Sequence, residues 1–279
     1  MGIDPKDWAR LKKFAYVAIA DQDPDITEGH RDRALERAHS EIFSYFAAEL
    51  AKDTAGRVDL IGAIAHAEVA GCPLAYEDKL FNSYSVLLGA TVTASHAANA
   101  AVLALIENPG QAELWRRTHC TDTFVEEVLR WSSPANHFLR HATRDTGIRG
   151  ARIAAGDAVT VWLGSANRDE EIFEDPYTFD VRRDPRPHVA FGVGAHRCIG
   201  APLARVALRV FAEEVLACVE SFESAGPVDH LASNFIAGIK RLPVRVRLRP
   251  DAERQLARLE PLDHSAAGRR LDGRSGTHA

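Results

Sequence analysis

Cys198 stands where its sulfur could bind a metal. It ends a short glycine-containing loop, and a helical pattern of apolar residues begins directly after Gly200, with Pro202 in the first turn. Proline suits that turn, because its missing N–H would have no partner there. Unpaired N–H groups at the beginning of a helix stabilise an anionic thiolate, and a thiolate is a strong ligand for soft metals, including haem iron. Cys198 is therefore a candidate metal ligand, and the glycines would let a flat macrocycle approach the backbone closely.

The residues around Cys198 resemble the haem-thiolate loop of the soluble, bacterial-type cytochrome P450 family. That pattern has a phenylalanine, a turn with glycines, a basic residue near the cysteine and a following glycine. The resemblance implies haem b as the cofactor, Cys198 as the iron ligand and His196 as a donor to a haem propionate. The cofactor-binding residues that it implies in the loop are Phe191, Gly192, His196, Cys198 and Gly200, and Gly194 completes the pattern.

Two other interpretations of Cys198 are weaker. A lone cysteine before a helix is commonly a buried core residue, but here the whole loop pattern accompanies it. A zinc site is disfavoured, because the four cysteines include no Cys-x-x-Cys pair; they are Cys72, Cys120, Cys198 and Cys218.

The longest helical pattern runs from 77 to 108, and because it is apolar all round we expect it to be buried in a large core. By resemblance, its centre crosses the oxygen-binding face of the haem. Ala90 would be small enough to admit the macrocycle, and Thr93 matches the family threonine that hydrogen-bonds oxygen at the iron. Val92 occupies the place of the family's acidic residue. The alternative is a plain core helix whose threonines bond their own i−4 carbonyls.

Glu127 and Arg130 stand three residues apart in a helical pattern over 121–132, so they share a face and can pair. By resemblance they are the family's Glu-x-x-Arg, a buried ion pair that holds the scaffold behind the haem. A surface pair, which contributes little to stability, is the alternative. The family often adds a third arginine further along the chain, and here either Arg182 or Arg183 could take that role.

Short runs of strand-forming residues follow over 138–143, 148–153 and 158–162, and they predict a small antiparallel sheet with tight turns. By resemblance, Arg140 on the first of these strands pairs with a haem propionate, since an arginine fits a carboxylate bidentately. A solvated strand face is the alternative. The segments 233–238 and 242–248 resemble the family's final hairpin.

Together with helical patterns over 5–20, 34–50 and 59–64, these elements predict a mainly α fold with a small antiparallel β sheet. The resemblance implies a cytochrome P450 fold that lacks its N-terminal part, either because the true start lies upstream or because the protein is a natural fragment. We expect a haem-thiolate domain over 1–250 and a disordered tail over 251–279, where apolar residues are sparse.

The bulk composition excludes several classes of protein. The net charge of −5 over 279 residues argues against general nucleic-acid binding. The chain does not begin with basic residues followed by an apolar run, so a signal peptide is not predicted. It contains no uncharged run of eighteen or more apolar residues, so a membrane span is not predicted. Four unpatterned cysteines fit a reducing compartment. We therefore expect a soluble cytoplasmic monomer.

The resemblance implies a haem-thiolate monooxygenase that inserts one oxygen atom of O2 into a small lipophilic substrate, such as a terpenoid, a steroid-like molecule or a secondary metabolite. Ferredoxin and ferredoxin reductase would supply electrons through a basic surface made by Arg182, Arg183, Arg186 and Arg197. A solvated basic patch is the alternative for these arginines. A peroxide-driven haem-thiolate enzyme would suit the missing acid, and a non-catalytic truncated member that acts as a binding or accessory protein is the third possibility.

Overall fold

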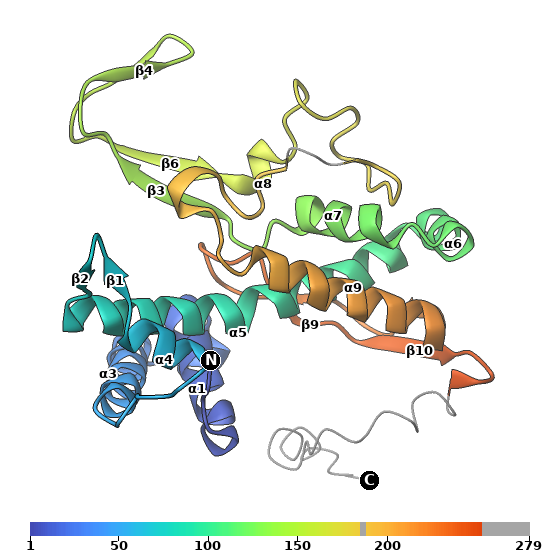
Figure 1. The fold of residues 1–279 in the computed structure, drawn as a ribbon. Helices are drawn as coiled ribbons and strands as arrows, with labels where there is room; N and C mark the ends of the chain where they lie inside the picture. The colour runs from blue at the N-terminus through green and yellow to red at the C-terminus, as the bar shows by residue number, and fades with distance from the viewer. Residues whose placement is uncertain (185–187, 253–279) are drawn as a thin grey trace.

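The computed structural model describes residues 1–184 and 188–252, which form a helix-rich fold with small antiparallel sheets (Figure 1). The predicted fold class is confirmed. The helices are η1 (Pro5–Asp7), α1 (Trp8–Ile19), α2 (Pro24–Thr27), α3 (Arg31–Leu50), α4 (Leu60–Ala65), α5 (Tyr76–Glu107), α6 (Pro109–Thr118), α7 (Thr121–Ser132), α8 (Leu163–Ala166), η2 (Gly194–His196) and α9 (Ala201–Cys218). The sequence pattern does not predict α6, because Pro109 ends one helix and, with its fixed φ, also begins the next.

Helix α5 connects the two halves of the core. In Figure 1 it crosses the molecule, with α1, α3 and α4 near its first half and α6, α7 and α9 near its second. One apolar cluster joins Leu87 of α5 to residues of α1 and α3. A second cluster joins Ala101 of α5 to residues of α7 and α9. The middle of α5, between these clusters, is therefore held in a fixed place relative to α9 and the loop before it.

The expectation that α5 is buried on every side is wrong. Phe81 is 60% exposed, and Gly89 and Ala90 are also exposed. Phe81 contacts Phe43 of α3 at its edge, with ring centroids 5.5 Å apart, whereas a Cβ added at Gly89 would meet no atom within 4 Å. α5 is thus apolar because it packs into two separate clusters, and the stretch at Gly89 and Ala90 in its centre is open.

By length and composition, α5 is also apolar enough to cross a membrane, contrary to the expectation that no segment of the chain would be. Core helices of soluble proteins meet the same criterion. Here α5 contacts α1, α3, α7 and α9, and both apolar clusters are built on it. In this fold α5 is therefore a core helix that other helices pack against.

The predicted strands pair antiparallel, but they do not share one sheet. β3 (His137–His141) pairs with β6 (Ala158–Trp162), whereas β4 (Thr146–Ile148) pairs with β5 (Ala151–Ile153). The run predicted over 148–153 is split because Arg149 and Gly150 have φ of 47° and 83°. Two successive left-handed residues make the tight turn of a two-residue hairpin.

The last strands also pair differently from the prediction. β10 (Val244–Leu248) pairs with β7 (Val219–Ser224), which follows α9 directly, and β8 (Asp229–His230) pairs with β9 (Ile239–Arg241). Residues 233–238 lie in the connection between β8 and β9. A further small pair joins β1 (Glu68–Val69) to β2 (Cys72–Pro73).

The tail predicted over 251–279 lies outside the described residues, apart from Asp251 and Ala252. Ala252 is fully buried beside Cys218 and Val219. The last described residue is therefore packed against the end of α9 and the beginning of β7.

Candidate active site

The loop that carries Cys198 is folded back on itself ahead of α9. Gly192 and Gly194 have φ of 66° and 74°, a left-handed conformation that glycine adopts without strain. The N–H of Cys198 donates to the carbonyl of Phe191 at 2.8 Å, and the N–H of Arg197 donates to the carbonyl of Gly194 at 3.0 Å. These bonds hold Cys198 just before α9, with its side chain exposed.

The surroundings of the Cys198 thiol fit a haem ligand. Within the described part of the chain the thiol has no hydrogen-bond partner, and the neighbouring apolar side chains of Val193 and Ile199 are 71% and 86% exposed. A Cβ added at Gly194 would meet no atom within 4 Å. An exposed thiol, with apolar neighbours and open backbone beside it, suits a large flat ligand that carries a soft metal at its centre.

The centre of α5 presents Ala90 and Thr93. Ala90 is exposed, and a Cβ added at the neighbouring Gly89 would meet no atom within 4 Å, so this stretch leaves room for a ligand. The hydroxyl of Thr93 donates to the carbonyl of Gly89 at 3.0 Å, which is the i−4 bond of the plain-helix alternative. The oxygen of a hydroxyl that donates in this way still has lone pairs free to accept a hydrogen bond.

Val92 lies in the core. It is 1% exposed and packs in an apolar cluster with Ile19, Leu231 and Ile236. A carboxylate in its place would be buried among these apolar side chains without a partner, which is costly. The position that the family pattern gives to an acid is thus a packing position in this chain.

Arg140 and His196 are both exposed, Arg140 on β3 and His196 in η2. Arg140 donates from Nη1 to the carbonyl of Leu139 at 2.8 Å. Neither side chain forms an ion pair within residues 1–184 and 188–252. Both side chains therefore have no carboxylate partner within these residues and could donate hydrogen bonds to the carboxylate of a ligand.

Glu127 and Arg130 form a completely buried ion pair. Both side chains are 0% exposed, and Nε and Nη2 of Arg130 donate to the two carboxylate oxygens of Glu127 at 2.7 and 2.8 Å. Nη1 of Arg130 donates to the carbonyls of Asn167 and Pro176 at 2.8 and 2.9 Å. The pair thus ties α7 to the segment that follows α8, which an exposed pair on one helix would not do.

The third member of this cluster is Arg183 rather than Arg182. Nε of Arg183 lies 3.3 Å from Oε1 of Glu127, and its Nη2 donates to the carbonyls of Asp175 and Thr178 at 3.0 and 3.1 Å. Arg182 is exposed and lies 4.0 Å from an oxygen of Asp180. Two adjacent arginines fit the sequence pattern equally, and only the course of the backbone selects between them.

A second ion network, which the sequence analysis does not predict, lies beside the first. Glu126 accepts a hydrogen bond from Nε2 of His188 at 2.9 Å, and from Nε and Nη2 of Arg205 at 2.5 and 2.9 Å. Burial alone would raise the pKa of Glu126, but the hydrogen bonds from His188 and Arg205 outweigh it and lower the pKa to about 2. The one available signal in the sequence is that Glu126 directly precedes Glu127 and so points from a different face of α7.

The stabilising contribution of Glu126 to the folded state is expected to be lost in acid. A carboxylate whose folded pKa lies below its unfolded value of 4.5 stabilises the fold above that value, and this contribution is lost as the pH falls towards 2. The contribution is about 3 kcal/mol at most. We expect the difference in unfolding free energy between the parent and Glu126→Gln, measured in urea, to shrink between about pH 6.5 and about pH 3.5. An equal difference at both values would contradict the assignment.

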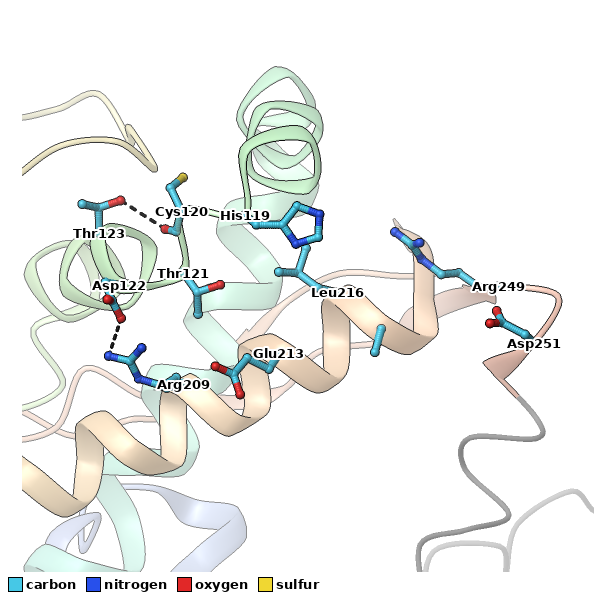
Figure 2. A pocket seen from close by; sticks show the side chains of 11 residues that line it. His119, Cys120, Thr121, Asp122, Thr123, Arg209, Glu213, Leu216, Arg249 and Asp251 are labelled. Carbon is cyan, nitrogen blue, oxygen red and sulfur yellow. Dashed lines mark hydrogen bonds and ion pairs between the residues drawn. The ribbon is translucent and has the colours of Figure 1, made fainter.

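A groove of about 690 Å³ lies along the second half of α9 (Figure 2). Asp122 pairs there with Arg209, and the hydroxyl of Thr123 donates to the carbonyl of Cys120 at 3.1 Å. Arg209 is eight residues beyond the first residue of α9, which corresponds to about 12 Å along the helix. The groove is therefore separate from the Cys198 loop and contains none of the predicted site residues.

Comparison with known proteins agrees with this fold and this loop. Residues 111–223 match the family model described as Cytochrome P450. Methyl-branched lipid omega-hydroxylase of Mycobacterium bovis is 37% identical over 251 residues, which are 88% of this chain and 58% of that protein. Linalool 8-monooxygenase of Pseudomonas putida is 34% identical over 247 residues, 88% of this chain and 60% of that protein. The structure of cytochrome P450 CYP268A2 of Mycobacterium marinum in complex with pseudoionone matches with a TM-score of 0.81 and 30% identity, over 87% of this chain and 60% of that one.

The comparisons agree with a helix-rich fold that has an exposed cysteine in a glycine loop and a buried Glu-x-x-Arg pair. The chain belongs to the cytochrome P450 family, whose members carry haem b. It spans about three fifths of the length of the relatives described above.

Proposed function

We propose that this chain is the haem-thiolate part of a cytochrome P450 monooxygenase, which inserts one oxygen atom of O2 into a small lipophilic substrate. The observation that carries the proposal is the exposed Cys198 thiol, presented by a loop with two left-handed glycines directly before α9. Relatives named as a lipid hydroxylase and a linalool monooxygenase support the class of reaction and the lipophilic character of the substrate.

The chain would hold haem between the Cys198 loop and α5. A thiolate-ligated haem supplies the activation of O2, and the protein supplies orientation and proton control. Cys198 would bind the iron through its Sγ atom. Phe191, Gly192 and Gly200 would shape the loop against one face of the macrocycle, while the small side chain of Ala90 leaves room on α5.

The polar residues of the site would pair with the charged propionates of the haem and take part in proton delivery. Arg140 and His196 would pair with the two propionates, since both are free of carboxylate partners within the described residues. Thr93 would accept a hydrogen bond at the oxygen-binding side through its free lone pairs. Water would deliver the proton, because the side chain of Val92 can neither donate nor accept one.

Electrons would come from ferredoxin and ferredoxin reductase in the cytoplasm, and the chain would act as a monomer. Arg182 and Arg197 are exposed on the approach to the Cys198 loop and could meet an acidic partner. Arg183 is instead used in the Glu127 cluster, and Arg186 lies outside the described residues. The predicted basic surface therefore keeps only part of its charge for docking.

Two rival functions remain distinct from this proposal. A peroxide-driven haem-thiolate enzyme is favoured by the core position of Val92, because peroxide brings its own protons and electrons to the reaction. The second rival is a binding or accessory role without catalysis. Activity that depends on peroxide rather than on electron donors would indicate the first rival, and a folded chain that takes up no haem would indicate the second.

The proposal is tested by adding haem to the purified chain, reducing it under carbon monoxide and recording the visible spectrum. A thiolate ligand gives a characteristic red-shifted Soret band, and we expect to see it. A protein that melts cooperatively but takes up no haem would overturn the proposal. Haem uptake with a Soret band of the non-thiolate type would assign the iron to another residue.

Thr93→Ala is expected to lower the amount of product formed per electron consumed, with more reduced oxygen released as peroxide. General acid–base assistance is typically worth about 10²–10⁴-fold, so its loss should be visible. Thr91→Ala is the matched control, because Thr91 also donates to its own i−4 carbonyl, that of Leu87, on the same helix. Equal coupling in the parent and in both variants would exclude Thr93 from the proton route.

A further inference from the structure

The Glu126 network joins three parts of the chain at the entrance to the Cys198 loop. Glu126 comes from α7, His188 from the segment that leads into the loop, and Arg205 from the first half of α9. The carboxylate accepts from His188 at 2.9 Å and from Arg205 at 2.5 and 2.9 Å. Side-chain exposure is 22% for Glu126, 4% for His188 and 33% for Arg205, so these charge-assisted bonds are only partly screened by solvent.

The same network encloses Phe191, the first residue of the loop. The guanidinium carbon of Arg205 lies 4.7 Å from the centroid of the Phe191 ring, within the range of a cation–π contact. The centroid of the His188 ring lies 6.1 Å from that of the Phe191 ring, and the two rings are tilted by 49°. Phe191 also packs against the apolar cluster of α5, α7 and α9. Its side chain is therefore fixed by neighbours from several elements.

A backbone hydrogen bond links Phe191 to Cys198. The carbonyl of Phe191 accepts the N–H of Cys198 at 2.8 Å, the bond that closes the loop. The N–H of Ala190 donates to Nδ1 of His188 at 3.2 Å, so Nε2 carries the proton that is donated to Glu126. Glu126, Arg205, Phe191 and Cys198 are thus linked in turn by an ion pair, a cation–π contact and a backbone hydrogen bond.

This network is distinct from the Glu127 cluster, although the two glutamates are adjacent. Glu127 binds Arg130, Arg183 and the N–H of Asp180, and it organises the segment before residue 185. Glu126 instead binds the segment after residue 187 and α9. One turn of α7 therefore holds both flanks of the approach to the cysteine loop, each through its own carboxylate.

We propose that Glu126, His188 and Arg205 are positioning residues for Cys198, which they orient by fixing Phe191. The inference rests on the proposed function, in that Cys198 is taken as the iron ligand. None of the three residues would touch the cofactor. Their loss would leave the thiol present but held in a wider range of positions.

The first test measures hydrogen exchange at the backbone amides of residues 189–198 in the apo-protein, which needs no haem. We expect Glu126→Gln to speed exchange in this loop at least about tenfold, as loss of a charge-assisted hydrogen bond allows, with little change in α1 and α3. Glu171→Gln is the matched control, since Glu171 also binds an arginine bidentately, Arg149, but on an exposed surface. Loop exchange that is unchanged in Glu126→Gln would overturn the proposal.

The second test asks whether the chemistry of the contact matters beyond packing. Arg205→Lys keeps the charge but loses the bidentate geometry and the planar face over Phe191. We expect it to lower the fraction of the reduced carbon monoxide complex that shows the thiolate Soret band. His188→Gln keeps an N–H donor towards Glu126 and should retain more of that band than His188→Leu. Identical fractions in parent and all three variants would overturn the positioning role.

The two tests separate this inference from the proposed function. A chain that takes up no haem but shows faster loop exchange in Glu126→Gln would refute the haem proposal and support the network. A chain that shows the thiolate band in every variant, with unchanged loop exchange, would do the reverse. If Glu126→Gln does not fold, loop exchange in Arg205→Lys decides the question.

Discussion

Replacing Cys198 by alanine is expected to abolish the red-shifted Soret band of the reduced carbon monoxide complex completely. That band depends on the thiolate as axial ligand, and within the described residues no other cysteine lies in the glycine loop before α9. The measurement is the visible spectrum after haem addition, with haem content determined separately. A variant that binds haem without the band would show that the loop still holds the macrocycle when the ligand is lost.

Two control variants accompany Cys198→Ala. Cys72→Ala removes another exposed cysteine, on β2, and Cys218→Ala removes a buried one at the end of α9. Both should keep the band, and Cys218→Ala should lose only a little stability, since a small side chain is removed from the core. If Cys198→Ala retains the thiolate band while either control loses it, the iron ligand has been assigned to the wrong cysteine.

Glu127→Ala is expected to destabilise the fold by about 3–5 kcal/mol, because it leaves the guanidinium of Arg130 buried without its counter-charge. The side chain of Arg130 is 0% exposed and cannot reach water in place of the lost carboxylate. Since whole domains are stable by only about 5–15 kcal/mol, the variant should be largely unfolded or insoluble. The free energy of unfolding in urea, or soluble yield where refolding fails, measures the effect.

The control for this prediction is an ion pair of similar geometry on the surface. Arg149 and Glu171 are 72% and 66% exposed, and Glu171→Ala should change stability by less than about 1 kcal/mol. A double variant, Glu127→Leu with Arg130→Leu, should recover part of the loss, since it removes the completely buried, unpaired guanidinium of Arg130. Glu127→Ala that melts like the parent would mean that Arg130 finds another counter-charge.

The sequence by itself determined the elements that depend on local pattern. The bounds of α7 and the beginning of α9 after Gly200 follow from apolar periodicity and from a proline in the first turn, which are properties of neighbouring residues. The Cys198 loop was likewise visible in the sequence, because its glycines, basic residue and cysteine lie within a few positions of one another. The positions of β3, β6 and β10 were also predicted to within a few residues, since strand-forming residues cluster locally in the sequence.

Only the tertiary structure decided which distant residues meet. Arg183 rather than Arg182 joins Glu127, and β10 pairs with β7, because the backbone between the partners takes one particular path. Which partners meet depends on the free energy of contacts between segments tens of residues apart, and a short sequence pattern carries no information about those contacts. Val92 shows the same limit: the sequence placed it beside Thr93, but the packing of α5 against α1 and the β8–β9 connection turns it into the core.

The Glu126 network is the clearest case of what tertiary structure adds. Its members are 62 and 79 residues apart along the chain, and each is an ordinary charged or polar residue on its own. They meet because α7 and α9 pack against each other and the segment ahead of the cysteine loop brings His188 to Glu126. The local sequence pattern thus identified Cys198 as the candidate ligand, whereas the packing of three separate segments forms the network that we propose holds it in position.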